Sequence, residues 1–98
     1  MKTERPLITT ILQLRMVSRI LKLTELKKED NGWIYPTEVT IPLKIKYSAL
    51  QSYLDKLEKR GIIRRLSHTV RTEWGGVFRL TEKGKTELLK EMNGFLRL

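Results

Sequence analysis

The sequence predicts a small, mainly helical α+β domain, and three patterns support that prediction. Apolar residues recur at helical spacing near both ends of the chain and again at Leu50, Leu54 and Leu57. The β-branched pair Ile62-Ile63 directly follows Gly61, a residue that commonly ends a helix, so a strand is expected to begin there. A second strand is expected just before the last helical pattern, and the two strands would form a hairpin.

Length and composition fit one domain spanning residues 1–98. With 98 residues, of which 40% are hydrophobic, the chain can bury one compact core. It has no cysteine, which excludes disulfides and thiolate metal sites. No apolar run approaches the roughly 20 residues that cross a bilayer, and the N-terminus lacks a signal-peptide pattern. We therefore expect a cytoplasmic protein with no membrane partner.

The positive charge is concentrated in the middle of the chain. Twenty Lys and Arg residues against eleven Asp and Glu residues give a net charge of +9. Residues 44–79 hold nine cations and three anions, a net charge of +6. Such a segment favours a polyanionic partner, because each neutralised phosphate releases condensed counterions. Charge alone leaves a solubilising basic surface as an open alternative.

The first helix is expected over about residues 6–28, with Thr3 to Pro6 as its start. Its apolar residues fall on two sides of an ideal helical wheel. One group is Leu7, Ile11, Leu14, Val17 and Leu21, and the other is Ile8, Leu12, Met16, Ile20, Leu23 and Leu26. A small domain covers one such stripe, so part of this helix is predicted to form a homodimer contact. The alternative is a bent or broken helix that packs both stripes within the monomer.

A short second helix is expected over residues 36–41, with Pro36 near its first position. Pro42 removes one amide donor and disfavours helical geometry at Ile41, so this helix should be short or kinked. Residues 43–45 would then form the turn into the next helix.

The central helix is expected from about Lys46 to Arg60. The face opposite its leucines is polar and cationic: it carries Lys46, Tyr47, Ser48, Gln51, Ser52, Asp55 and Lys59. A helix with such a face, followed at once by a basic strand, suits an element that reads DNA. The alternative is an ordinary solvated helix face.

Strands at about residues 62–67 and 76–80 are expected to pair antiparallel, joined by a loop rich in turn formers. Thr81 is expected to cap the last helix, over about residues 81–96. Its apolar residues repeat at helical spacing: Leu88, Leu89, Met92, Phe95 and Leu96. This helix is the second candidate dimer surface, and simple coverage of the monomer core is the alternative.

Two stretches of the chain resemble winged helix-turn-helix regulators of the MarR and PadR kind. Residues 54–63, Leu-Asp-Lys-Leu-Glu-Lys-Arg-Gly-Ile-Ile, are similar to the end of the recognition helix and the strand after it. Residues 78–84, Phe-Arg-Leu-Thr-Glu-Lys-Gly, are similar to the end of the wing and the start of the next helix. The resemblance covers roughly residues 37–89. It implies a winged helix-turn-helix fold, a homodimer, and residues 33–35 as a small first strand or an apolar lead-in to the second helix.

These patterns together predict a sequence-specific regulator that binds double-stranded DNA as a homodimer. Base reading is assigned to Tyr47, Ser48, Gln51 and Ser52, with Gln51 able to make a two-point contact to adenine. Phosphate contacts are assigned to Lys44, Lys46, Lys59, Arg64 and Arg65. The resemblance implies a cation at the wing, for which Arg71 is the first candidate, with Arg65 and His68 behind it. Two copies would read half-sites about one DNA turn apart.

A second function from another class is a protein-interaction module of a transcription or replication assembly, because one scaffold hosts both uses. Asp55 and Glu58 on the central helix favour it, since both would weaken phosphate contact. Single-stranded nucleic acid is disfavoured by the lack of an interleaved aromatic and basic strand pattern. An enzyme finds little support, because the sequence offers neither a Gly-rich phosphate loop nor a nucleophile set. With His68 as the single histidine, no metal or cofactor is expected.

Overall fold

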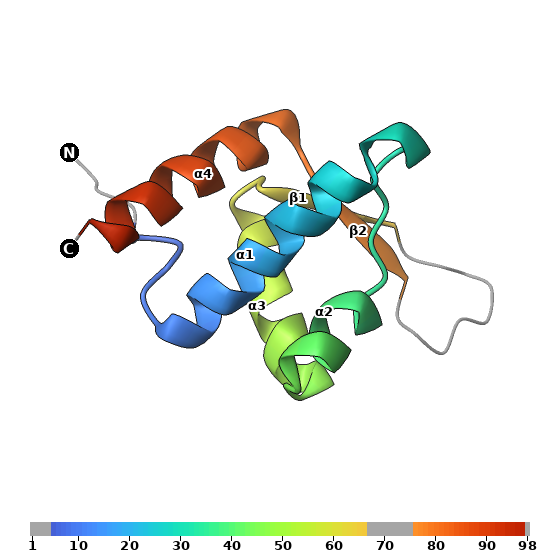
Figure 1. The fold of residues 1–98 in the computed structure, drawn as a ribbon, viewed down its shortest axis with the longest axis horizontal. Helices are drawn as coiled ribbons and strands as arrows, with labels where there is room; N and C mark the ends of the chain where they lie inside the picture. Colours follow the sequence, from blue (N-terminus) through green and yellow to red (C-terminus); the bar gives the residue numbers. More distant parts are fainter. Residues whose placement is uncertain (1–4, 67–75, 98) are drawn as a thin grey trace.

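The structure is a computed structural model that describes residues 5–66 and 76–97. These residues form four α-helices, one short 3-10 helix and a two-stranded sheet. The elements in chain order are α1 (Ile11–Leu26), η1 (Lys28–Asp30), α2 (Thr37–Leu43), α3 (Tyr47–Lys59), β1 (Ile63–Leu66), β2 (Val77–Leu80) and α4 (Glu82–Leu96). Figure 1 shows α1 crossing the middle of the molecule, with α4 on one side of it and α2 and α3 on the other. The predicted mainly helical α+β class is confirmed. Each helix in the described ranges is too short or too polar to cross a membrane.

Helix α1 begins at Ile11, so the prediction of a helix from about residue 6 is wrong. Thr10 has an extended backbone, with φ −132° and ψ 162°, and its side chain accepts a hydrogen bond from the Gln13 amide at 3.0 Å. This is an N-cap, in which a hydroxyl satisfies one of the unpaired amides of the first turn. Residues 5–9 therefore precede the helix and form an N-terminal arm without regular secondary structure.

The N-terminal arm contributes two side chains to the core, because Leu7 and Ile8 are both buried. Their amides donate to the Glu91 carboxylate of α4, at 2.7 Å for Leu7 and 3.3 Å for Ile8. The buried Tyr53 hydroxyl of α3 donates to the Leu7 carbonyl at 2.7 Å. Burial raises the pKa of this hydroxyl, and the nearby Glu91 carboxylate raises it further. Tyr53 thus remains a neutral donor that fastens the arm to α3.

The core takes residues from both apolar groups of the predicted first helix. Val17 comes from one group and Met16, Ile20 and Leu23 from the other, and all are buried. The apolar residues of α1 that remain exposed are Ile11 at 64%, Leu12 at 36% and Leu26 at 65%. The monomer therefore packs parts of both stripes, since the shorter helix and the arm present them to different neighbours.

Helix α2 is short, as Pro42 predicts, but it continues one residue past the proline to Leu43. Pro42 has no amide hydrogen to donate to the carbonyl four residues earlier, that of Glu38. The Arg19 side chain of α1 compensates, because its Nε donates to the Glu38 carbonyl at 3.0 Å. The residue after the helix is its C-cap, Lys44, whose φ of 55° is left-handed. A lysine at this position gives little sequence signal for such a turn, which usually favours glycine or asparagine.

The Arg19 bond should depend on the proline. Arg19→Ala should lower the free energy of unfolding by about 1–3 kcal/mol, because it leaves the half-buried Glu38 carbonyl without its donor. In a Pro42→Ala background the new amide can bond to the same carbonyl, so the cost of Arg19→Ala should fall by at least half. Urea unfolding of the unchanged chain, the two single variants and the double variant measures both costs. Lys22→Ala, on the exposed surface of α1, is the control. Equal costs in the two backgrounds would contradict the compensation.

Helix α3 and the sheet follow the sequence prediction closely. Leu50, Leu54 and Leu57 are buried, and the helix is followed by Gly61 in a left-handed conformation with φ 73°. Strands β1 and β2 pair antiparallel, with Ile63 opposite Leu80 and Leu66 opposite Val77. On the other edge of β2, Ile34 forms a bridge with Phe78, so the predicted small first strand is reduced to one residue pair.

Helix α4 begins directly after the sheet. The Thr81 hydroxyl accepts from the Gly84 amide at 2.8 Å and donates to the Gly61 carbonyl at 2.8 Å, which confirms the predicted cap and joins α4 to the end of α3. The helix then passes without interruption through Asn93-Gly94 to Leu96.

Candidate nucleic-acid interface

The side of α3 that faces away from the leucines is open to solvent. Ser48, Ser52, Asp55 and Lys59 follow one another along it and all are exposed. Tyr47 begins the helix and is 42% exposed. Two of the predicted base-reading residues, Ser48 and Ser52, therefore lie on the first half of an accessible helix face.

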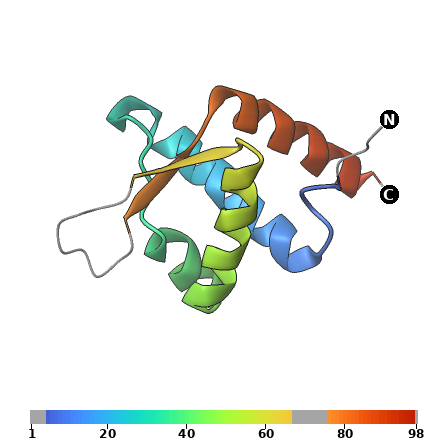
Figure 2. The ribbon, with the colours of Figure 1, turned by 180° about the vertical axis from the view of Figure 1, so that it is seen from behind.

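Exposed cations lie at both ends of this face. Lys44 and Lys46 belong to the turn between α2 and α3, and Lys59 is the last residue of α3. Arg64 is exposed on β1, the strand that follows. Figure 2 shows α3 at the front of the molecule, with α2 beside its first half and β1 leading away from its last turn. The structure thus brings these four predicted phosphate contacts to the ends of α3 and to the adjoining strand.

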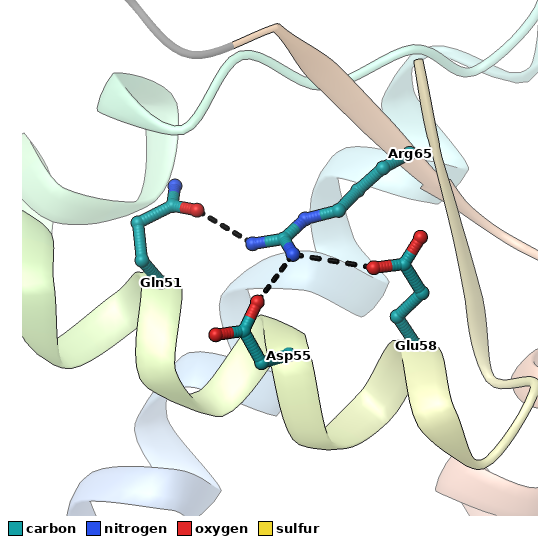
Figure 3. A network of polar contacts seen from close by, with 4 residues as sticks. All are labelled: Gln51, Asp55, Glu58 and Arg65. Atoms are coloured by element: carbon teal, nitrogen blue, oxygen red, sulfur yellow. Dashed lines mark hydrogen bonds and ion pairs between the residues drawn. The ribbon is translucent and has the colours of Figure 1, made fainter. Parts of the chain in front are cut away.

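Arg65 and Gln51 occupy a different position from the other predicted residues, because they contact each other. The Arg65 guanidinium donates through one nitrogen to the Gln51 side-chain oxygen at 2.5 Å. Its other terminal nitrogen lies 2.5 Å from the Asp55 carboxylate and 3.3 Å from that of Glu58. Figure 3 shows the guanidinium lying across one side of α3 between these three side chains. The predicted phosphate contact and the predicted base reader are therefore parts of one network.

Two of the cations in residues 44–79 make contacts within the fold. Arg79 donates to the Asn31 carbonyl at 2.6 Å, and its guanidinium lies 5.1 Å from the centre of the Trp33 ring. Arg60 donates to the Arg5 carbonyl of the N-terminal arm at 2.6 Å. These roles depend on contacts distant in sequence, and local patterns give no signal for them.

The predicted wing residues His68 and Arg71 lie outside the described residues, so their roles remain predictions. Within residues 5–66 and 76–97, no group of three or more His, Asp or Glu side chains is placed to hold a metal ion. The arrangement that the described residues do provide is a polar helix face between exposed cations, which suits non-covalent binding of a polyanion.

Comparison with known families identifies the class of protein. A family model described as winged helix-turn-helix matches residues 12–98. The chain therefore belongs to the winged helix-turn-helix family, and the resemblance noted from the sequence is confirmed. A search of curated proteins gave no significant match.

Solved structures share the fold. Sso10a-2, a DNA-binding protein from Sulfolobus solfataricus, is 25% identical with a TM-score of 0.60, over 86% of this chain and 77% of that one. A MarR family transcriptional regulator from Silicibacter pomeroyi is 17% identical with a TM-score of 0.56, over 86% of this chain and 54% of that one. A variant of Lactococcus lactis ZitR is 21% identical with a TM-score of 0.56, over 98% of this chain and 61% of that one. The region matched is thus little more than half of the last two proteins.

Proposed function

We propose that this protein is a transcriptional regulator that binds double-stranded DNA sequence-specifically as a homodimer. The observation that carries the proposal is the exposed polar face of α3, which lies between exposed cations in a winged helix-turn-helix domain. The structures with the same fold include a DNA-binding protein and a MarR family transcriptional regulator. These names support DNA as the partner.

In the proposed complex, the first half of α3 enters the major groove, which is wide enough for a helix. Ser48 and Ser52 face base edges, with Tyr47 and Gln51 beside them. Lys44 and Lys46 at one end, and Lys59 and Arg64 at the other, contact phosphates and fix the register of the helix on the duplex. The wing residues His68 and Arg71 extend this contact along the backbone.

The proposed dimer rests on exposed apolar side chains of α1 and α4. Ile11 and Leu26 of α1 and Leu96 of α4 are 64%, 65% and 64% exposed, and Leu89 of α4 is 41% exposed. Burying such residues against a second copy would remove apolar surface from water. A two-fold dimer would match inverted half-sites, which dimeric helix-turn-helix proteins bind about one DNA turn apart.

The ion pairs of Arg65 weaken one argument for the alternative, a protein-interaction module. Asp55 and Glu58 favoured it, because free carboxylates on α3 would repel phosphate. Both carboxylates are within ion-pair distance of Arg65. Their charge is therefore partly offset where DNA would approach, and DNA remains the partner that the geometry supports better.

Selection of bound duplexes from a random pool tests the proposal directly. The most enriched duplex is expected to contain two inverted half-sites about one DNA turn apart. Enrichment of a single, asymmetric site would contradict the dimer, and failure to enrich any sequence would contradict specific binding. Light scattering on the free protein, with Leu89→Lys and Leu96→Lys as interface variants and Lys90→Ala as control, measures the oligomeric state separately.

A further inference from the structure

An open groove lies between α1 and α2 and has a volume of about 470 Å³. Its lining residues are Leu14, Arg15, Ser18, Arg19 and Lys22 of α1 and Leu43 of α2. We call Arg15, Arg19 and Lys22 the groove cations. Leu14 and Leu43 are half-buried and pack against the core, whereas Arg15 and Lys22 are exposed. The groove therefore has an apolar base with positive charge around it.

Two of the groove cations are held by backbone carbonyls of α2. Arg15 donates through Nη2 to the Leu43 carbonyl at 3.2 Å, and Arg19 donates through Nε to the Glu38 carbonyl at 3.0 Å. A guanidinium has five N–H donors, so each side chain keeps others for a partner. Because both side chains are already ordered, a ligand that binds them loses less conformational entropy.

No carboxylate among the described residues offsets the charge of the groove cations. Residues 11–24 contain neither Asp nor Glu. The two nearby acidic side chains are paired with other lysines: Glu25 with Lys28 and Glu38 with Lys27, each at 2.9 Å. In the part of the chain that the structure describes, the groove cations have no ion-pair partner. The groove is therefore suited to an acidic ligand.

The spacing of the groove cations fits carboxylates on a helix. Arg15, Arg19 and Lys22 stand at positions i, i+4 and i+7, so they share one side of α1. The first and last are roughly 10 Å apart along the helix axis. A helix with acidic residues at the same spacing and apolar residues beside them would match both the charge and the base of the groove. A single inorganic anion would leave the apolar base unused.

The groove and the polar face of α3 lie on different sides of the core. On α1, Met16 and Ile20 are buried, and Arg15 and Lys22 are exposed on the other side of the helix. The leucines of α3 are buried in the same core, and its polar face is turned to solvent. Figure 1 shows α1 in front of α3, and Figure 2, turned by 180°, shows α3 in front of α1. Both surfaces can therefore be occupied at the same time.

We propose that the groove binds an acidic, amphipathic helix of another protein while α3 contacts DNA. Carboxylates of that helix pair with the groove cations, and its apolar side chains contact Leu14 and Leu43. A second copy of this chain is the less suitable occupant. A two-fold axis presents the same patch of both copies to each other, so it would bring like charges together. A dimer contact through α4, or through one end of α1, leaves the groove open.

Fluorescence anisotropy with two labelled synthetic peptides tests this inference on the full chain. One peptide carries three glutamates at the spacing of the groove cations, with leucines beside them, and the other has glutamine in place of each glutamate. The glutamate peptide should bind about 3- to 100-fold more tightly. Arg15→Gln combined with Lys22→Gln should weaken its binding by about 2- to 30-fold. Lys83→Gln combined with Lys90→Gln removes the same charge from α4 and should have little effect.

Lys22→Glu is a second variant that leaves the bond from Arg15 to Leu43 in place. It should also weaken binding of the glutamate peptide, and thermal unfolding checks that each variant is folded. Equal affinity for the two peptides, or equal losses in the groove and α4 variants, would overturn the inference. Release of the glutamate peptide by unlabelled duplex DNA would instead assign the groove to the DNA surface. A changed oligomeric state of the groove variants in light scattering would assign it to a second copy.

Discussion

Gly84→Ala should lower the free energy of unfolding by about 2–4 kcal/mol. A Cβ atom at this position would lie 2.0 Å from the Ile62 carbonyl oxygen and 2.7 Å from the carbonyl carbon. Both are backbone atoms at the start of the sheet, and the same carbonyl accepts from the Thr81 amide at 3.0 Å. They cannot swing aside as the end of a flexible side chain would. Alanine would therefore push α4 away from β1 and loosen the cap at Thr81.

Gly94→Ala provides a matched control in the same helix. Apart from its chain neighbours and the backbone of its own helix, no described atom lies within 4 Å of a Cβ at Gly94. Alanine should therefore stabilise the protein by about 0.5–1 kcal/mol, because glycine in a helix loses more backbone entropy on folding. Urea unfolding followed by circular dichroism measures both variants. Similar losses at the two positions would show that the close approach to Ile62 is unimportant.

Affinity for random duplex DNA should fall by about 10³–10⁵-fold as salt rises from about 50 to 200 mM, if each complex makes six to ten phosphate contacts. The physical reason is that every neutralised phosphate releases counterions, and added salt opposes their release. Fluorescence anisotropy with a labelled duplex gives the slope of log affinity against log salt. Little binding at any salt concentration would instead favour the protein-interaction module.

Charge variants locate the cations that produce this slope. Lys59→Ala and Arg64→Ala, both on or beside α3, should each reduce the slope by about 0.9 for every phosphate that the variant no longer neutralises. Lys90→Ala is the control, because Lys90 is also an exposed cation but lies on α4. A larger effect at Lys90 than at Lys59 would place the DNA on another face.

Local sequence patterns predicted the elements whose causes are local. The leucine stripe of α3, Gly61 after its end and the Thr81 cap each depend on residues a few positions apart. The predicted start of α1 is wrong because Leu7 and Ile8 continue the apolar spacing of the helix. Thr10 and Gln13 have the spacing of an N-terminal capping pair, and that signal could have marked the true start.

The candidate site was predicted in composition but not in its internal contacts. Gln51, Asp55 and Glu58 share one side of a helix, which spacing alone shows. Which of Arg64 and Arg65 contacts them depends on how the strand faces α3, and the bond from Arg65 to Gln51 joins residues 14 apart in sequence. The Arg19 bond to α2 likewise depends on packing, because Arg19 of α1 replaces the amide donor that Pro42 of α2 lacks.

The bond from Arg19 to the Glu38 carbonyl also joins two parts of the molecule that the proposed function uses separately. It connects α1, a candidate for the interface between two subunits, to α2, which directly precedes α3, the helix proposed to read DNA. In a dimer built on α1, a rotation of one subunit against the other would carry both α2–α3 pairs with it. The separation of the two α3 helices would then depend on the packing at the subunit interface.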